Sequence, residues 1–154
     1  MSKVILALAS VGGHNVQLRK LISNLNLPEY EIIYINASPD ASFDDKKNIS
    51  DCSYIIQDVS RDNVYLSLKT IFQIFKIINH TKPSFLITTG ALPGLISVLV
   101  GRAFGVNTIW VDSIANSKKL SFSGKYASYF SNITITQWPE LASDNVQYHG
   151  NILE

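Results

Sequence analysis

The sequence predicts an α/β fold of the Rossmann-like type, in which helices flank a parallel β-sheet. Short apolar runs rich in β-branched residues alternate along the whole chain with segments of helical length. That alternation is typical of a parallel sheet whose strands are joined by helices. The chain has 154 residues and neither an internal repeat nor a linker, so residues 1–154 are expected to form one domain.

Six strands are expected, at residues 4–9, 31–36, 54–56, 85–89, 108–111 and 133–135. In the 3-2-1-4-5-6 order of a doubly wound sheet, the first and fourth strands are neighbours at the switch in strand order. Ligands of such sheets bind outside the carboxyl ends of the strands at this switch. We therefore expect the loops after the first and fourth strands to face one crevice.

The segment after the first strand has the spacing of an amphipathic helix. Leu18, Leu21, Ile22 and Leu25 recur at steps of three and four residues. Pro28 follows shortly afterwards, as is common beyond a helix end. By contrast, segment 37–51 is polar and aperiodic, and it is expected to be a surface loop.

A second helix, expected over residues 63–79, has apolar residues on more than one side. One stripe consists of Val64, Leu68, Ile71, Phe72, Phe75 and Ile78. A second stripe consists of Leu66, Ile74 and Ile77, with Lys69 and Lys76 nearby. Either the helix packs between the sheet and a neighbouring element, or its second stripe contacts lipid or a partner protein while the lysines meet phosphate head groups. The residues expected at such a contact are Leu66, Lys69, Phe72, Ile74, Lys76 and Ile77.

Residues 85–101 contain no charged side chain and approach the length of a membrane-spanning helix. Gly90, Pro93 and Gly94 interrupt the run. A buried strand, a tight loop and a buried helix account for the same residues, because strands covered on both faces read as continuous apolar runs. We expect this second arrangement.

Composition limits the classes of function. The formal net charge is +1, so the overall charge does not indicate nucleic-acid binding. Cys52 is the only cysteine, which excludes an internal disulfide and a cysteine-based zinc site and favours a reducing, cytoplasmic compartment. The first residues lack the pattern of a signal peptide. His80 and His149 lack the spacing of metal ligands, so no metal site is expected. No NAD cofactor is expected either, because the third glycine of G-x-G-x-x-G is missing and the second strand ends at Asn36 instead of an acid.

The first candidate ligand site is the run Ser10-Val11-Gly12-Gly13-His14, between the first strand and the first helix. Adjacent glycines let the backbone approach a ligand closely, and a helix start offers unpaired N–H groups and a partial positive charge. These features suit a phosphate or diphosphate. His14, at the lip of this site, suits proton transfer near neutral pH. The alternative is a tight turn that His14 caps.

Two further motifs follow predicted strands. Thr89 and Gly90 lie at the carboxyl end of the fourth strand, where a glycine-containing loop begins and plain turn formation is the alternative. Asp112 and Ser113 follow the fifth strand, where the carboxylate is placed to accept a hydrogen bond from an acceptor hydroxyl or to orient the histidine of the first motif. Lys125 offers a cation for phosphate, although a solvated helix face is the commoner role of such a lysine.

Together these motifs resemble one family. They are residues 10–14, the Thr-Thr-Gly of 88–90, the Asp-Ser of 112–113 and residues 120–125, in this order. The sequence resembles the Alg-type membrane-anchor subunit of the eukaryotic transferase that adds the second GlcNAc to dolichol-pyrophosphate-GlcNAc. It is similar to that subunit's bacterial counterparts, the PssD and CpsF proteins of polysaccharide synthesis, and more distantly to the N-terminal domain of MurG. The resemblance spans nearly the whole chain.

The resemblance implies a GT-B glycosyltransferase fold divided between two proteins. This chain would be the N-terminal half, which binds the acceptor, while a separate subunit would bind the UDP-sugar. The glycines of the first motif and Gly90 match the acceptor-side loops, and His14 matches the general base. Asp112 stands where eukaryotic relatives commonly have glutamate, and Asn116 stands where they commonly have arginine. Acceptor or phosphate contacts are expected from Ser10, Gly12, Gly13, Thr89, Gly90, Ser113 and Lys125, with His14 and Asp112 as catalytic residues.

The expected function is therefore inverting transfer of a sugar from a UDP-sugar to a polyprenyl-pyrophosphate-linked saccharide at the cytoplasmic face of the membrane. The chain would bind the membrane peripherally, through residues 63–79 and 118–130, and would be inactive without its donor-binding subunit. Two alternatives remain open. One is a non-catalytic anchor or activator of a catalytic partner, and the other is a free-standing Rossmann enzyme that binds a nucleotide by itself.

Overall fold

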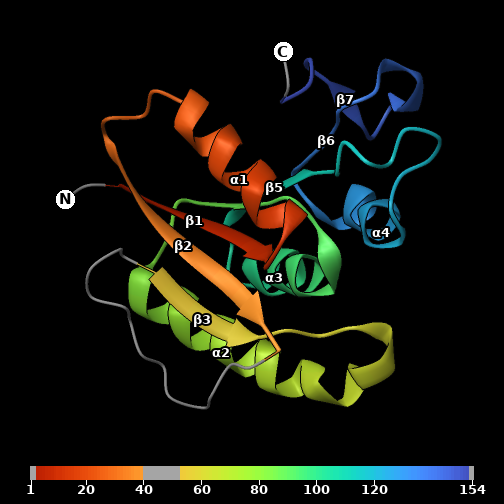
Figure 1. The fold of residues 1–154 in the computed structure, drawn as a ribbon. Coiled ribbons are helices and arrows are strands. Elements are labelled where there is room, and N and C mark those ends of the chain that lie inside the picture. The colour runs from red at the N-terminus through yellow and green to blue at the C-terminus, as the bar shows by residue number, and fades with distance from the viewer. Residues whose placement is uncertain (1–2, 40–52, 153–154) are drawn as a thin grey trace.

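The computed structural model describes residues 3–39 and 53–152. Within these ranges the chain forms one parallel sheet in the order β3-β2-β1-β4-β5-β6-β7 (Figure 1). The strands are β1 (Lys3–Ser10), β2 (Tyr30–Ser38), β3 (Ser53–Gln57), β4 (Phe85–Thr88), β5 (Asn107–Val111), β6 (Ile133–Thr136) and β7 (Gln147–Tyr148). The predicted order of the first six strands is confirmed, and the switch between β1 and β4 lies at the centre of the sheet.

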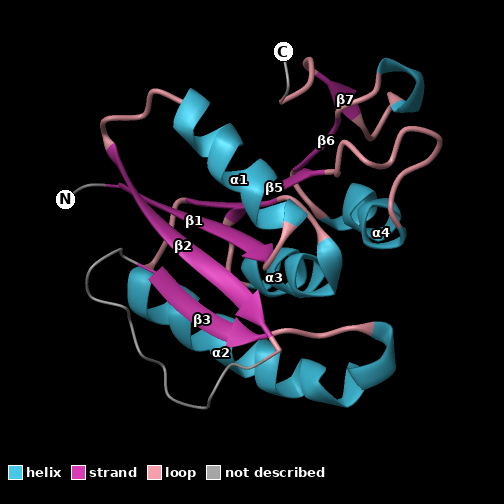
Figure 2. Ribbon diagram, in the orientation of Figure 1, coloured by secondary structure: helices cyan, strands magenta, loops and turns pink. Residues whose placement is uncertain are grey.

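Helices cover both faces of this sheet (Figure 2). They are α1 (Gly13–Asn24), α2 (Ser67–Thr81), α3 (Ala91–Ala103) and α4 (Phe122–Phe130), with the short 3-10 helices η1 (Arg61–Leu66) and η2 (Pro139–Leu141). Helix α1 packs on one face of β1. Helices α2 and α3 pack on the opposite face, and α4 extends that layer beside α3 over β5.

Strand β1 forms the centre of the core because its successive side chains enter two different apolar clusters. Leu6 and Leu8 pack in the cluster that contains the α2 and α3 side chains. Ile5, Ala7 and Ala9 pack with the α1 side chains on the other face. Both faces of β1 are therefore buried, which explains why its sequence is a continuous apolar run instead of an alternation of apolar and polar residues.

The segment predicted as one helix over 63–79 is instead η1 followed by α2. The backbone of Asn63, at φ −130°, breaks the helical geometry within η1, and Ser60 caps its start. Ile74, Ile77 and Ile78 are buried against the sheet. The prediction that Leu66, Ile74 and Ile77 face lipid or a partner is therefore wrong, because this stripe is the one that covers the sheet, with Leu66 partly buried against the same cluster.

The outward surface of α2 belongs to the other predicted stripe. Leu68 is 76% exposed, and Ile71, Phe72 and Phe75 are exposed as well. Lys76 lies over the ring of Phe72, 4.9 Å from its centroid. Of the predicted contact residues on this helix, Phe72 and Lys76 thus lie on the exposed surface.

The uncharged run 85–101 forms β4 and most of the buried helix α3, as predicted. In the part of the chain that the structure describes, no helix combines the length and hydropathy needed to cross a bilayer. Strand β7, a parallel neighbour of β6, was not predicted, because it is two exposed residues long and has no apolar run. Of the predicted loop 37–51, Ala37 and Ser38 end β2, while residues 40–51 and Cys52 lie outside the described residues.

Candidate functional site

A cleft of about 690 Å³ opens at the carboxyl ends of the strands. The arrowheads of β1, β2 and β3 point to this edge of the sheet in Figure 2. The walls come from the β1–α1 turn, the segment after β3, the start of α3 and the segment from β5 to α4. The lining residues are Ser10, His14, Asp58, Val59, Ser60, Arg61, Val64, Ala91, Leu92, Ser113, Ala115, Asn116, Ser121, Phe122 and Ser123. The cleft thus lies where open α/β sheets bind ligands.

His14 joins the two predicted loops. Its Nδ1 lies 2.9 Å from the backbone oxygen of Thr89, and the Thr89 hydroxyl donates to the backbone oxygen of His14 over 2.7 Å. A carbonyl oxygen only accepts hydrogen bonds, so this contact requires the proton on Nδ1, which leaves Nε2 as the acceptor nitrogen of the neutral ring. The tautomer is thus fixed by backbone geometry, and the ring lines the cleft.

Gly90 leaves the space that the His14 ring occupies. A Cβ at this position would lie 2.8 Å from Cε1 and 2.9 Å from Nδ1 of His14. The backbone of Gly90 also has φ +135°, a conformation that favours glycine. In the first loop, Gly12 has φ +97°, whereas a Cβ at Gly13 would meet no atom within 4 Å. The positive φ therefore favours glycine at positions 12 and 90, and the His14 ring leaves no room for a Cβ at position 90.

Helices α1 and α3 both begin at this edge without a side-chain cap. The N–H groups of the first residues of α1, and of Ala91 and Leu92 on α3, therefore have no side-chain cap at the two glycine loops, while Pro93 has no N–H. Thr89, by contrast, is fully buried, and its hydroxyl is engaged with the backbone of His14. Thr89 positions the histidine and is not placed to bind the acceptor directly, which corrects its predicted role.

Asp112 is 1% exposed, and its carboxylate holds the cleft wall together. Oδ1 accepts from Trp110 Nε1 over 3.2 Å and from the Ser121 hydroxyl over 2.6 Å. Oδ2 accepts from the Ser121 N–H over 2.9 Å and from Asn116 Nδ2 over 3.2 Å. Four donors use the acceptor capacity of a carboxylate. The prediction that Asp112 orients His14 is therefore wrong, and this aspartate instead fixes the segment between β5 and α4.

The remaining predicted residues divide between the cleft and the outer surface. Ser10 and Ser113 line the cleft. The Ser10 hydroxyl donates to Asp58 Oδ1 over 3.2 Å, and the Ser113 hydroxyl accepts from Gln17 Nε2 over 3.1 Å. Lys125 is exposed on α4 and is not among the lining residues.

Sequence reasoning missed one wall of the cleft, the segment after β3. Asp58 Oδ1 accepts from the Val59 N–H over 2.9 Å, in addition to the Ser10 hydroxyl. Ser60 caps η1, and Arg61 follows it at the mouth of the cleft. The segment contains no glycine motif. Its position after a strand of the same parallel sheet was the available signal.

Gln17 and Gln137 tie α1 to the segments after β5 and β6. The side-chain oxygen Oε1 of Gln17 accepts from the Ile114 N–H over 3.2 Å and from Gln137 Nε2 over 3.1 Å. Gln137 Nε2 also donates to the Asp112 backbone oxygen over 2.9 Å. Both side chains stabilise the backbone beside the cleft from the α1 face of the sheet.

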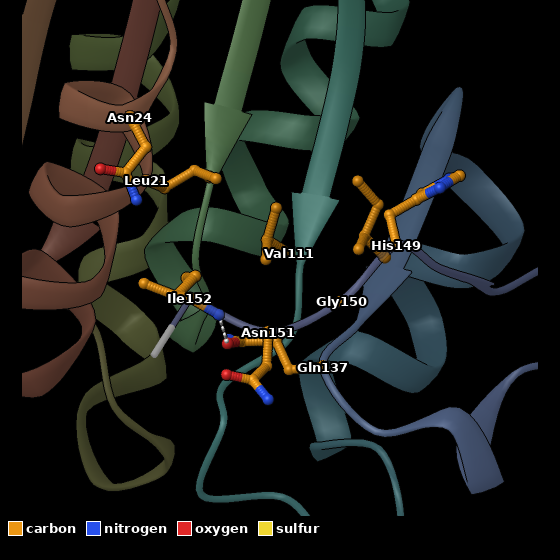
Figure 3. A pocket seen from close by; sticks show the side chains of 9 residues that line it. Leu21, Asn24, Val111, Gln137, His149, Gly150, Asn151 and Ile152 are labelled. Atoms are coloured by element: carbon orange, nitrogen blue, oxygen red, sulfur yellow. Dashed lines mark hydrogen bonds between the residues drawn. The ribbon is translucent and has the colours of Figure 1, made fainter. Parts of the chain in front are cut away.

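A smaller pocket of about 180 Å³ lies between α1 and residues 149–152 (Figure 3). Leu21 of α1, Val111 of β5 and Ile152 contribute apolar side chains to it. The Ile152 N–H donates to Gln137 Oε1 over 3.1 Å, which holds Ile152 beside the end of β6. The pocket shares no lining residue with the cleft. Within ranges 3–39 and 53–152, no group of three or more metal-ligating side chains gathers at either place.

The chain is similar in sequence to a eukaryotic glycosyltransferase subunit. It is 27% identical over 164 residues to the human UDP-N-acetylglucosamine transferase subunit ALG14, across 89% of this chain and 76% of the human protein. The ALG14 of Yarrowia lipolytica is 22% identical over 173 residues, across 95% and 79% of the two chains. No protein-family model matches the chain.

Solved structures share the fold. MurG of Acinetobacter baumannii superposes with a TM-score of 0.73 at 13% identity, across 97% of this chain and 46% of MurG. The Staphylococcus aureus MnaA–UDP structure superposes with a TM-score of 0.69 at 14% identity, across 97% and 44%. The chain thus spans slightly less than half of these proteins. It has the Rossmann-like fold of the N-terminal domains of GT-B glycosyltransferases and of the epimerases built like them.

Proposed function

We propose that this chain is the acceptor-binding subunit of a two-protein inverting glycosyltransferase of polysaccharide synthesis. The transferase moves a sugar from a UDP-sugar, bound mainly by a donor subunit, to a polyprenyl-pyrophosphate-linked saccharide. The similarity to ALG14 subunits and the fold shared with MurG support this proposal. The observation that carries it is His14, which lines the cleft with Nδ1 held by Thr89 and Nε2 available as a proton acceptor.

His14 acts as the general base in this proposal. The acceptor hydroxyl oxygen bonds to the anomeric carbon of the donor while the bond from that carbon to UDP breaks. The hydroxyl proton passes to Nε2 of His14, and UDP leaves with the electron pair of the broken bond. Attack from the side opposite UDP inverts the anomeric configuration. The Thr89 carbonyl keeps the proton on Nδ1 and stabilises the imidazolium that forms.

The uncapped starts of α1 and α3 provide a place for the acceptor diphosphate. Both helices point their N–H groups and partial positive charge toward the edge of the sheet where the cleft opens. Gly12 and Gly13 leave open space beside the first of these helix starts. The diphosphate therefore approaches the backbone without a side chain in its way.

The outer surface of α2 and α4 binds the membrane in this proposal. Exposed apolar side chains cover both helices, namely Leu68, Ile71, Phe72 and Phe75 on α2 and Phe122, Tyr126, Tyr129 and Phe130 on α4. Lysines on the same helices, Lys76 beside Phe72 and Lys125, suit anionic head groups. The chain then sits peripherally on the cytoplasmic face, with the cleft opening toward the lipid that carries the acceptor.

A transfer assay tests the proposal. A short-chain polyprenyl-pyrophosphate sugar and UDP-sugars are incubated with this protein, with its candidate donor subunit, and with the two together. The proposal predicts transfer only in the mixture. Full transfer by the donor subunit alone would reduce this chain to a non-catalytic anchor, and transfer by this chain alone would make it a free-standing enzyme.

A further inference from the structure

Two of the cleft's wall segments, the one after β3 and the one from β5 to α4, are joined by a contact between Arg61 and Phe122. The guanidinium carbon of Arg61 lies 4.5 Å from the centroid of the Phe122 ring. Arg61 follows β3 at the start of η1, while Phe122 begins α4 after β5, and both line the cleft. Segments from opposite sides of the sheet's central switch thus form the mouth together.

Arg61 is held in place while its donors remain available. The Ser60 hydroxyl accepts from the Asp62 N–H, and Asn63 Oδ1 accepts from the Ser60 N–H, so the backbone on both sides of Arg61 is fixed. No carboxylate of the described residues forms an ion pair with its guanidinium. An aromatic ring contacts an arginine through the flat face, which leaves the in-plane N–H groups free to bind an anion.

Charge around the mouth favours an anion at Arg61. It is the one lysine or arginine among the residues described as lining the cleft. The acid on the same wall, Asp58, has one carboxylate oxygen engaged by the Ser10 hydroxyl and the Val59 N–H. A ligand anion at the mouth therefore meets a single strong cation with a forked set of donors, which suits phosphate oxygens.

Apolar side chains continue outward from this cation on both walls. On the first wall Val64 and Tyr65 follow Arg61 along η1, and both are exposed. On the second wall the rings of Phe122, 56% exposed, and Tyr126 pack edge to face with centroids 5.0 Å apart. A cation flanked by exposed apolar side chains matches a ligand with an anionic head and a hydrocarbon chain.

The geometry points to Arg61 as the side chain that, together with the N–H groups at the starts of α1 and α3, binds the diphosphate of an isoprenoid diphosphate. Phe122, Tyr126 and Val64 contact the first isoprene units. This assignment rests on the proposed function and adds to it the residues that select a lipid-linked acceptor. Phe122 has two roles here, because the same ring orients the guanidinium and contacts the hydrocarbon chain.

Isothermal titration of the isolated full chain tests the assignment without any sugar transfer. The probes are farnesyl diphosphate, inorganic pyrophosphate and farnesol. The variants are Arg61→Ala, Arg61→Lys, Phe122→Ala and Phe122→Tyr. Arg102→Ala is the matched control, because Arg102 is an exposed arginine in the last turn of α3, at the end of that helix away from the cleft.

We expect the unaltered chain and Arg102→Ala to bind farnesyl diphosphate more tightly than pyrophosphate or farnesol. Arg61→Ala weakens farnesyl diphosphate binding roughly tenfold or more, the loss of a charge-assisted hydrogen-bond pair, and Arg61→Lys recovers part of it. Phe122→Ala weakens farnesyl diphosphate binding about fivefold, because apolar contact with the hydrocarbon chain is lost. Phe122→Tyr binds farnesyl diphosphate as tightly as the unaltered chain does.

Equal binding by Arg61→Ala and Arg102→Ala overturns the assignment, and so does the absence of saturable farnesyl diphosphate binding by the unaltered chain. Equal affinity for pyrophosphate and farnesyl diphosphate overturns the lipid part, because it identifies a simple phosphate site. None of these results affects the mixing assay, so the failure of this assignment is distinguishable from failure of the proposed transferase function.

Discussion

The absence of a side chain at Gly90 gives the His14 ring its place in the candidate site. The ring of His14 occupies the space where a Cβ at Gly90 would project, and its Nδ1 bonds to the carbonyl one residue earlier. The glycine was predicted from its place after a strand. Its steric role was not, because the sequence does not reveal which side chain packs above a glycine.

Replacing Gly90 with alanine should therefore disturb both the backbone and the histidine. We expect a loss of about 1–3 kcal/mol in the free energy of unfolding from the unfavourable φ and the close contact with His14. Urea denaturation measures it. Gly13→Ala is the matched control, since its Cβ meets open space at a helix start, and its stability should be unchanged or slightly higher. Equal stability of the two variants would contradict this interpretation.

Asp112 is the residue whose predicted role differs most from the one that the structure indicates. It was predicted to act in the crevice, but it is enclosed by Trp110, Asn116 and Ser121, which all donate to it. Gly124 leaves room for it, because a Cβ there would lie 2.5 Å from Oδ1. Its position after the fifth strand was predicted and is confirmed, but the sequence did not distinguish a catalytic carboxylate from one that organises a loop.

Asp112→Asn should destabilise the protein, because an amide has one acceptor oxygen and turns its own N–H groups toward the donors that the carboxylate satisfied. We expect a loss of about 2–3 kcal/mol in the free energy of unfolding, measured by urea denaturation. Asp144→Asn, at an exposed position, is the control and should change stability by less than about 0.5 kcal/mol. Loss of transfer by Asp112→Asn at full stability would instead restore a catalytic role.

Helix α2 shows what periodicity determines and what it leaves open. The sequence predicted two apolar stripes on the segment, and the structure has an exposed and a buried one, except that Ile78 lies with the buried side chains and not in the stripe to which it was assigned. Spacing alone did not indicate which stripe covers the sheet, because each has enough apolar residues to do so. The structure places Ile74, Ile77 and Ile78 in the core and leaves Leu68 and Phe72 outside. An exposed apolar helix surface of this kind is typical of membrane or protein contact.

Charged residues on this exposed surface should prevent membrane binding. We expect the double variant Leu68→Glu, Phe72→Glu to lose affinity for vesicles of anionic phospholipid by more than about tenfold, since two apolar side chains no longer enter the interface. Vesicle flotation measures the bound fraction. Val16→Glu is the control, because Val16 is 68% exposed on α1, on the opposite face of the sheet. This variant should bind vesicles as the unaltered chain does. Equal loss in both variants would contradict α2 as the contact surface.

In the whole molecule, the fold was predictable because parallel sheets obey strict connection rules. The strand order places β1 beside β4, and this brings residues 10–14 and 89–90 together, as the hydrogen bonds between His14 and Thr89 show. The wall formed by the segment after β3 was not predicted. Asp58, Ser60 and Arg61 follow β3, the edge strand that β2 separates from β1 and the central switch. They have no motif of their own, so their approach to α4 depends on the twist and packing of the complete sheet.

The central claim is that His14 takes the acceptor proton, and the most direct measurement is the turnover of His14→Ala in the reconstituted mixture with the donor subunit. Binding between the two proteins is measured in the same samples. His80→Ala is the control, because His80 is exposed at the end of α2. We predict that turnover falls by roughly 10²- to 10⁴-fold in His14→Ala, with subunit binding intact and His80→Ala fully active. Full turnover by His14→Ala would contradict the claim.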